Sequence, residues 1–211
     1  MLRTIIFSIL CICVLSVHAQ PLQVVRLTAP DKTRGSAVMK ALNERQSIRE
    51  YSTESLKPQD LSDLLWAANG VNRDDGRRTA PSTRNLQEVE IYVAFPEGIY
   101  HYNAAEHVLN LKVAGDFREA VAASQAFVAT APISILLVAD MNKFGNLSES
   151  SRMFGAIDVG IVSQNISIAC AALGLATVPR GTMNHEVLRM ALKLSDMQLL
   201  MLNHPVGYPK N

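Results

Sequence analysis

The chain has 211 residues, of which 48% are apolar, 18% charged and 6% aromatic, and its formal net charge at pH 7 is +1. This length suits one domain, or two small ones, and allows a core large enough to fold without disulfides or metals. The near-neutral charge gives no electrostatic reason to expect nucleic acid or an anionic membrane as a partner. The high apolar content and the lack of like-charge blocks exclude an intrinsically disordered chain.

The first 19 residues have the order of a secretory signal peptide. Arg3 precedes an apolar run at 5–17, and Val17 and Ala19 place small residues before a cleavage point. We therefore expect cleavage after Ala19 and export to the periplasm or an equivalent compartment, with a retained anchor as the alternative. The run is short for a membrane span, and we expect no span in the mature chain. Cys170 would then be the only cysteine left, so the mature monomer cannot form an internal disulfide.

The mature chain is predicted to begin with an extended lead-in at 20–35. A helix is expected from Val38 to Gln46, and a second from Pro58, which suits a first helical turn, to Gly70. A polar loop follows at 71–85. The remaining predicted elements are strands at 89–95, 99–102 and 108–111, a helix at 116–129, a strand at 133–139, helices at 150–173 and 185–193, and a strand at 199–203. Strands and helices do not alternate strictly, which favours a single α+β domain over residues 36–211.

Two polar segments carry side chains suited to ligand binding. In the segment 45–51, Arg45 and Arg49 lie four residues apart on either side of Ser47, and two guanidinium groups with a hydroxyl can bind a phosphate and a planar ring. A solvated helix end is the alternative interpretation. In the segment 78–87, a proline turn is followed by serine, asparagine and glutamine, which can bind the polar edge of a heterocycle.

Two further segments could contribute backbone groups. At 172–181 a helix ends at Gly174 and a glycine-containing loop follows, whose free N–H groups could face an electron-rich ligand atom. An ordinary glycine cap is the alternative. The last segment, 205–210, contains Val-Gly-Tyr and would otherwise be a frayed tail.

Together these segments resemble the nitroreductase family of FMN-dependent oxidoreductases. The family pattern is R-x-S-x-R-x-[FY], then P-S-x-x-N-x-Q, then A-L-G-L followed by a loop with proline and glycine, and finally V-G-Y. All four parts occur here in that order over residues 36–210, and Asp158 with Gln164 and Asn165 fits the family's long central helix. The sequence of residues 78–82 is most similar to that of the compact branch related to thiazole- and oxazole-forming peptide dehydrogenases.

The resemblance implies a nitroreductase-like fold, with a mostly antiparallel sheet flanked by helices and a long central helix at a homodimer interface that holds FMN. It places Arg45 and Ser47 at the phosphate or ribityl end of FMN, Arg49 by the pyrimidine edge and Asn85 on the ring. Backbone N–H groups of the 179–181 loop would approach N5 or O4. The implied cofactor-binding residues are Arg45, Gln46, Ser47, Arg49, Pro81, Ser82, Asn85, Gln87, Pro179, Arg180, Gly181 and Lys210.

The implied activity is hydride transfer through flavin N5 by a ping-pong mechanism, with NAD(P)H or another small molecule as donor and a small-molecule acceptor. The flavin carries this chemistry, so no catalytic side chain is expected, and the histidine spacing suggests no metal site. Only Pro209, Lys210 and Asn211 follow V-G-Y, where larger members carry further basic residues. Two alternatives follow from this short end and from export: a non-catalytic ligand-binding protein that kept the fold, or a flavin dehydrogenase of a peptide or other exported substrate that does not use NAD(P)H.

Overall fold

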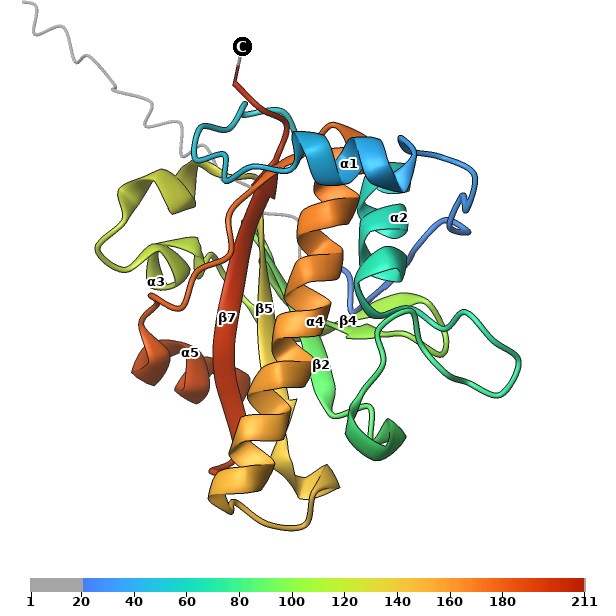
Figure 1. Cartoon of the computed structure of the whole chain (residues 1–211). Coiled ribbons are helices and arrows are strands. Elements are labelled where there is room, and N and C mark those ends of the chain that lie inside the picture. Colours follow the sequence, from blue (N-terminus) through green and yellow to red (C-terminus); the bar gives the residue numbers. More distant parts are fainter. Residues whose placement is uncertain (1–20, 211) are drawn as a thin grey trace, which may run out of the picture.

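The computed structural model describes residues 21–210, and the signal peptide predicted at 1–19 lies outside them. In this part of the chain one antiparallel sheet has helices packed on both of its faces (Figure 1). The predicted α+β class is therefore confirmed.

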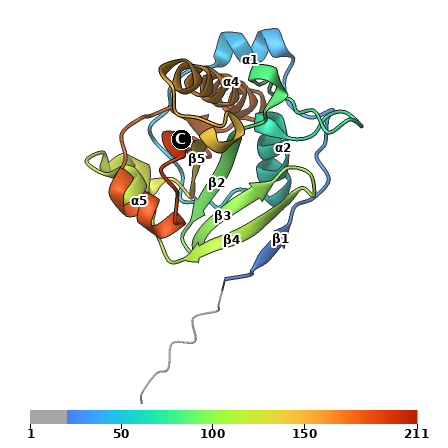
Figure 2. The same ribbon diagram turned by 90° about the horizontal axis from the view of Figure 1, so that it is seen from below.

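The sheet has seven strands in the order β1-β4-β3-β2-β5-β7-β6, and every neighbouring pair is antiparallel. The strands are β1 (Val24–Arg26), β2 (Val89–Phe95), β3 (Gly98–Asn103), β4 (Val108–Ala114), β5 (Ile133–Asp140), β6 (Ala176–Thr177) and β7 (Gln198–Gly207). Seen from below, β2, β3 and β4 form a meander with β1 along its outer edge (Figure 2). The chain before α1 adds β1 to the sheet, where it pairs with β4.

Capping signals in the sequence mark the ends of two of the helices, α2 and α4. The helices are α1 (Val38–Glu44), α2 (Pro58–Asn69), α3 (Arg118–Ala122), α4 (Glu149–Leu173) and α5 (His185–Leu192). Pro58 occupies the first turn of α2, where its missing N–H costs no hydrogen bond, and Gly70 caps the end. In α4 the Ser148 side chain accepts a hydrogen bond from the Ser151 amide, and Gly174 ends the helix in the left-handed conformation at φ 71°.

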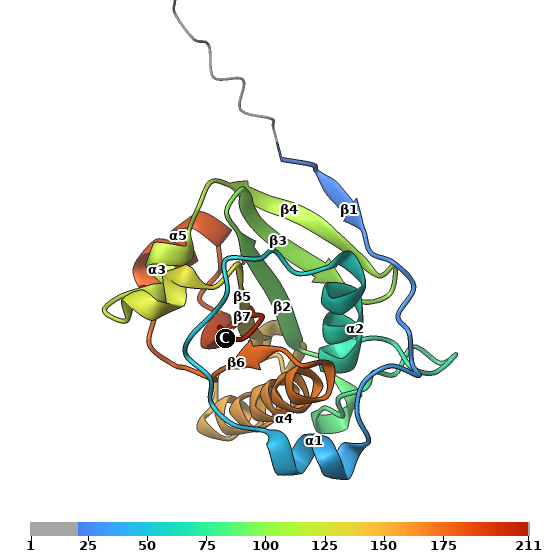
Figure 3. The same cartoon turned by 90° about the horizontal axis from the view of Figure 1, so that it is seen from above.

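Alternating strand residues build a separate hydrophobic layer on each face. Ile91 and Val93 of β2 face the layer that α2 and α4 cover, whereas Tyr92 and Ala94 face the layer of α3 and α5. Viewed from above, α1 lies over the outer side of α4, whereas α3 and α5 lie on the opposite side of the sheet (Figure 3). The polar segments predicted to bind a ligand lie at the ends of these helices and strands.

The long helix α4 is confirmed as the central helix of the fold. By length and hydropathy it is apolar enough to span a membrane, but it packs on α1, α2, β5 and β7 and has buried polar residues such as Asp158. Those contacts identify it as a core helix. Part of its surface remains exposed and apolar, at Met153, Phe154 and Ile157.

Three expectations need correction. The helix predicted at 116–129 is two short elements, α3 and a 3-10 helix at Ala126–Thr130, because Ala123 has a left-handed backbone at φ 49° that ends the first helix. The last strand extends beyond the predicted 199–203 to Gly207, so most of the Val-Gly-Tyr motif lies in the sheet. The short strand β6 was not predicted, since two residues carry no periodic signal.

Candidate functional site

The structure brings three of the four predicted segments together. The Ile48 amide donates to the Thr177 carbonyl at 3.0 Å, which joins the first segment to the third. Tyr51 pairs with Pro209 in an isolated bridge, and the Lys210 amide donates to the Glu50 carbonyl at 3.2 Å. These three segments therefore form one surface beside the end of α4.

The second predicted segment, 78–87, lies elsewhere in the chain, and its residues 81–87 form a loop. Its Thr83 amide donates to Oδ2 of Asp158 at 2.7 Å, whereas the Ala172 end of α4 lies near α1 and the first segment. At a rise of 1.5 Å per residue, the two points of α4 are roughly 20 Å apart along the helix. One protomer therefore does not place its own loop next to its own Arg49.

The first segment presents side chains that the protein does not use internally. Arg45, Gln46, Ser47 and Arg49 are all exposed. Neither arginine forms an ion pair within residues 21–210. Since an unpaired guanidinium group keeps all its donors available, this segment suits an anionic, planar ligand.

A cavity of about 810 Å³ opens between the first segment and the C-terminal tail. Its lining includes cations from three parts of the chain, at Arg49, Lys57 and Lys210, and aromatic rings at Phe127 and Tyr208; Glu50 and Glu54 are the acidic residues. Ligand pockets of ~300–1,000 Å³ hold drug-sized ligands, so the volume suits a mononucleotide.

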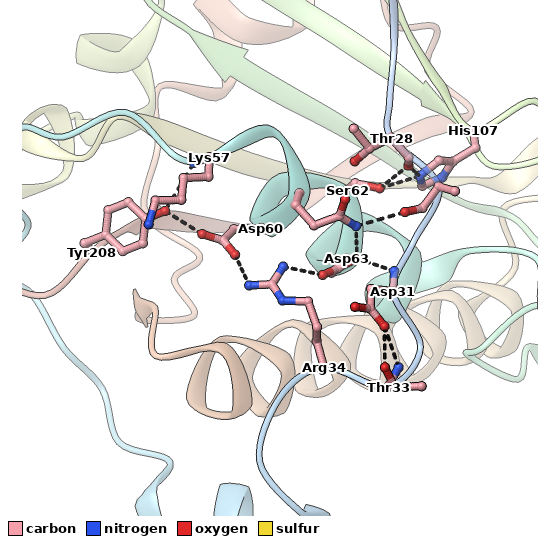
Figure 4. Close-up of polar contacts among 12 residues, drawn as sticks. Thr28, Asp31, Thr33, Arg34, Lys57, Asp60, Ser62, Asp63, His107 and Tyr208 are labelled. Carbon is pink, nitrogen blue, oxygen red and sulfur yellow. Dashed lines mark hydrogen bonds and ion pairs between the residues drawn. The ribbon is translucent and has the colours of Figure 1, made fainter.

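Tyr208 of the Val-Gly-Tyr motif is fixed by hydrogen bonds to α2, so this part of the tail is not frayed. Its hydroxyl donates to Oδ2 of Asp60 at 2.5 Å and accepts from the Lys57 amide at 3.2 Å. Arg34 in turn pairs with Asp60 at 2.5 Å and with Asp63 at 2.6 Å (Figure 4). Burial raises the pKa of Asp60, but hydrogen bonds from Tyr208 and Arg34 outweigh it, and the net pKa is lowered.

Sequence reasoning missed this network. Asp60 lies in the first turn of a predicted helix and Arg34 in the predicted lead-in, and neither segment carries a functional motif. The local pattern held no signal that would pair the two, because Arg34 and Asp60 are 26 residues apart.

The loop at 81–87 has an unusual backbone. Arg84, Asn85 and Gln87 all adopt positive φ, at 52°, 57° and 52°. Non-glycine residues in this region cost about 1 kcal/mol or more each and cluster at functional sites. The loop is held by its own polar groups: the Gln87 amide donates to Ser82 Oγ at 2.9 Å, and the Gln87 side chain donates to the Gly76 carbonyl at 3.2 Å. Pro81 and Asn85 are exposed and available to a ligand.

The role expected of Arg180 needs correction. Its amide donates to the Asn203 carbonyl at 2.9 Å and is therefore not free for a ligand. Its guanidinium group is buried, with hydrogen bonds to Gln125 Oε1 at 2.7 Å, Asn203 Oδ1 at 2.8 Å and two backbone carbonyls. Burial lowers the pKa of this guanidinium group. Pro179 and Gly181 are exposed on either side, which leaves the Gly181 amide as the candidate donor.

Comparison with known proteins identifies the pattern. The model described as the nitroreductase family matches residues 42–208. A protein of Methanocaldococcus jannaschii named as a nitroreductase is 33% identical over 183 residues, which cover 79% of this chain and 88% of the relative. An FMN reductase of Bacillus subtilis, named as using NAD(P)H, is 24% identical over 187 residues, covering 80% of this chain and 66% of the relative.

A solved structure shares the fold across nearly its whole length. The crystal structure of a protein from Ralstonia eutropha, described as a nitroreductase, has a TM-score of 0.83 and 34% identity. The match covers 90% of this chain and 91% of that one.

Proposed function

The chain belongs to the nitroreductase family, and we propose that it is an FMN-dependent reductase that takes electrons from NAD(P)H and passes them to a small-molecule acceptor. As a family member it is an oxidoreductase of the nitroreductase and FMN-reductase type. The named activity of the Bacillus subtilis relative supports the choice of FMN and NAD(P)H.

The observation that carries the proposal is the 810 Å³ cavity, whose lining cations form no ion pair within residues 21–210. Arg49, Lys57 and Lys210 line it, and Arg45 and Ser47 are exposed in the same segment. A phosphate group needs several such donors, and a flat ring needs a cavity of about this size. The residues present therefore fit FMN.

Each side chain has a distinct part in holding the cofactor. Arg45, Gln46, Ser47 and Lys210 would bind the phosphate and ribityl end. Arg49 would place a fixed positive charge at the ring, where charge develops on reduction, and the protein would not have to reorganise to stabilise it. When bound, FMN would supply the hydride chemistry at N5. Pro179 and the Gly181 amide would limit the position of the ring.

We propose that the active form is a homodimer in which the loop of one protomer completes the cleft of its partner. The loop at 81–87 lies roughly 20 Å along α4 from the end that borders the first segment, so Ser82, Asn85 and Gln87 would act on the partner's FMN. The exposed apolar residues of α4, Met153, Phe154 and Ile157, would be buried between the protomers.

Export and the peptide-dehydrogenase branch remain predictions from the sequence. The three relatives described above are named as nitroreductases or as an FMN reductase, and none as a peptide dehydrogenase. NAD(P)H is scarce outside the cytoplasm, so a dehydrogenase that passes electrons to another acceptor is the second candidate if the signal at 1–19 directs export.

Anaerobic reduction of the FMN-loaded protein tests the proposal. The purified chain is mixed with FMN, freed of excess by gel filtration, and titrated with NADH, NADPH and dithionite while flavin absorbance is recorded. We expect NADH or NADPH to bleach the bound flavin. Bleaching by dithionite alone would overturn NAD(P)H as the donor and favour the dehydrogenase. Loss of all flavin on the column would overturn FMN as the cofactor and favour the non-catalytic binding protein.

A further inference from the structure

Two buried carboxyl groups meet beneath the loop at residues 81–87. Glu88, immediately before β2, is 0% exposed, and Asp158 of α4 is 3% exposed. Asp158 is the neighbouring carboxyl group that, after burial, raises the pKa of Glu88, and its Oδ2 accepts the Thr83 amide at 2.7 Å. Glu88 and Asp158 therefore connect the sheet, the central helix and the loop.

Neighbouring cations do not neutralise the Glu88 carboxyl. It receives no donor hydrogen bond from any group in residues 21–210. A small cavity of about 140 Å³ next to it has five other charged or titratable groups in its lining: Arg78, Glu90, His101, Tyr102 and Lys143. The Arg78 charge lowers the pKa of Glu88, but Arg78 forms no ion pair with Glu88, and its buried Nε atom is also without a partner in the described chain.

Two carboxylates in contact away from water cannot both carry a full charge at neutral pH. Burial first, and then the contact with Asp158, raises the pKa of Glu88 to about 8. The pair then shares one proton, and Glu88 donates it to Asp158. The shared proton also gives the buried Glu88 carboxyl a hydrogen-bond partner, although no donor in residues 21–210 reaches it.

We propose that Glu88 is a positioning residue of the FMN site: by sharing one proton with Asp158, it holds Asp158 where it accepts the Thr83 amide and thereby fixes the loop at 81–87. This inference rests on the proposed function, because it takes the loop to be an FMN contact. The loop has left-handed backbone at Arg84, Asn85 and Gln87, so it depends on such anchors to keep its shape.

The direction of the pH effect follows from the raised pKa. In the unfolded chain Glu88 would titrate near its ordinary value of 4.5, so the folded state binds more protons between that pH and about 8. Its contribution to stability is greatest below that window and declines as the pH rises through it. Near pH 8 the folded protein loses the shared proton, the two carboxylates repel, and the Thr83 anchor loosens.

Two measurements test this inference, each on the parent protein and on Glu88→Gln. The first is FMN affinity from pH 6.5 to 9.5. The second is protection of the Thr83 amide against hydrogen exchange without FMN, corrected for the intrinsic rise of exchange with pH. We expect the parent to lose affinity roughly tenfold between pH 7 and pH 9, the fall in protonated fraction above a pKa of about 8. Thr83 protection should fall over the same range.

Glu88→Gln keeps a donor toward Asp158 at every pH, so its affinity and its Thr83 protection should stay constant. Exposed Glu106→Gln is the matched control and should follow the parent. Should Glu88→Gln fail to fold, Asp158→Asn replaces it, since an amide can accept from Thr83 and donate to Glu88 without a shared proton. Identical pH profiles for the parent and the folded variant would overturn the inference. Absence of FMN binding at pH 7 would refute the proposed function, while Thr83 exchange would still test the shared proton.

Discussion

The two segments proposed to contact FMN are built in opposite ways. At 45–49 the backbone is anchored to β6, and the polar side chains are exposed and without ion pairs. At 81–87 the backbone is left-handed at three residues, and several polar groups are bound to one another or to α4. The first segment keeps its hydrogen-bonding capacity for a ligand, whereas the second uses much of it to hold its own shape.

This difference separates residues that look alike in the sequence. Arg45, Arg49 and Arg180 all appeared as candidate cofactor contacts, yet only the first two are free. Arg180 is 7% exposed, and its guanidinium group is committed to α3, Gln125 and Asn203. Substitution should therefore change binding at free positions and stability at committed ones.

The largest effect is expected at the committed arginine. Arg180→Ala leaves Asn203 Oδ1 without its donor and removes a donor from each of the Val121 and Ala122 carbonyls, so we expect the free energy of unfolding to fall by ~3 kcal/mol. Urea denaturation measures this. Arg26→Ala, on exposed β1 at the opposite edge of the sheet, is the control and should change stability by less than ~0.5 kcal/mol. An Arg180→Ala protein with parental stability but weaker FMN binding would contradict the distinction between ligand-binding and structural arginines.

Substitution of the exposed Arg45 and Arg49 should weaken FMN binding and leave the stability of the protein unchanged. Arg45→Ala and Arg49→Ala each remove a charge-assisted contact, so FMN binding should weaken by ~1–3 kcal/mol. Their unfolding free energies should remain within ~0.5 kcal/mol of the parent, because both side chains are exposed. Fluorescence titration with FMN and urea denaturation measure the two quantities. Parental FMN affinity in both variants would refute these assignments.

Lowering the pH should destabilise the protein at a residue beneath the first segment. Raising the pH, in contrast, should loosen the loop at 81–87. Behind Thr177, which accepts from Ile48, lies buried His204, hydrogen-bonded to Ser163 at 2.8 Å. Burial lowers the pKa of His204 to about 3, below the value of 6.5 expected when unfolded. The unfolded chain therefore binds more protons as the pH falls below 6.5, and folded stability is lost in that direction.

Between pH 7 and pH 5 this histidine alone should lower the free energy of unfolding by about 2 kcal/mol. Urea denaturation at the two pH values measures it, with His204→Asn as the reference that lacks the titrating group. If both proteins lose the same stability over this interval, His204 is not the cause.

The smallest effect concerns the internal bonds of the loop. Ser82→Ala removes the acceptor of the Gln87 amide, and we expect a loss of about 1 kcal/mol in stability. FMN affinity should fall with it, since the left-handed residues lose a support. Unchanged thermal unfolding would show that the loop does not depend on this hydrogen bond.

Local patterns predicted most of the fold. Pro58 and Gly70 mark the ends of α2, Gly174 ends α4, and the apolar run at 133–139 is β5, because capping and periodicity act over a few residues. The helix predicted at 116–129 failed because nothing local required the left-handed backbone of Ala123.

The site was predicted less completely, for a physical reason. The exposed arginines and the polar loop carry short motifs that can be read directly. The pairing of Arg34 with Asp60 and the contact of Glu88 with Asp158 depend on packing between segments distant in the sequence. Neither leaves a local pattern, and both became visible only in the folded chain.

The central claim is that the cavity beside Arg49 binds FMN, and a titration tests it most directly. FMN fluorescence is followed at pH 7 as purified parent protein and Arg49→Ala are added. We predict saturable quenching by the parent, with the curve of Arg49→Ala shifted to protein concentrations roughly 5- to 150-fold higher. No quenching by the parent, or curves that coincide for the two proteins, would contradict the claim.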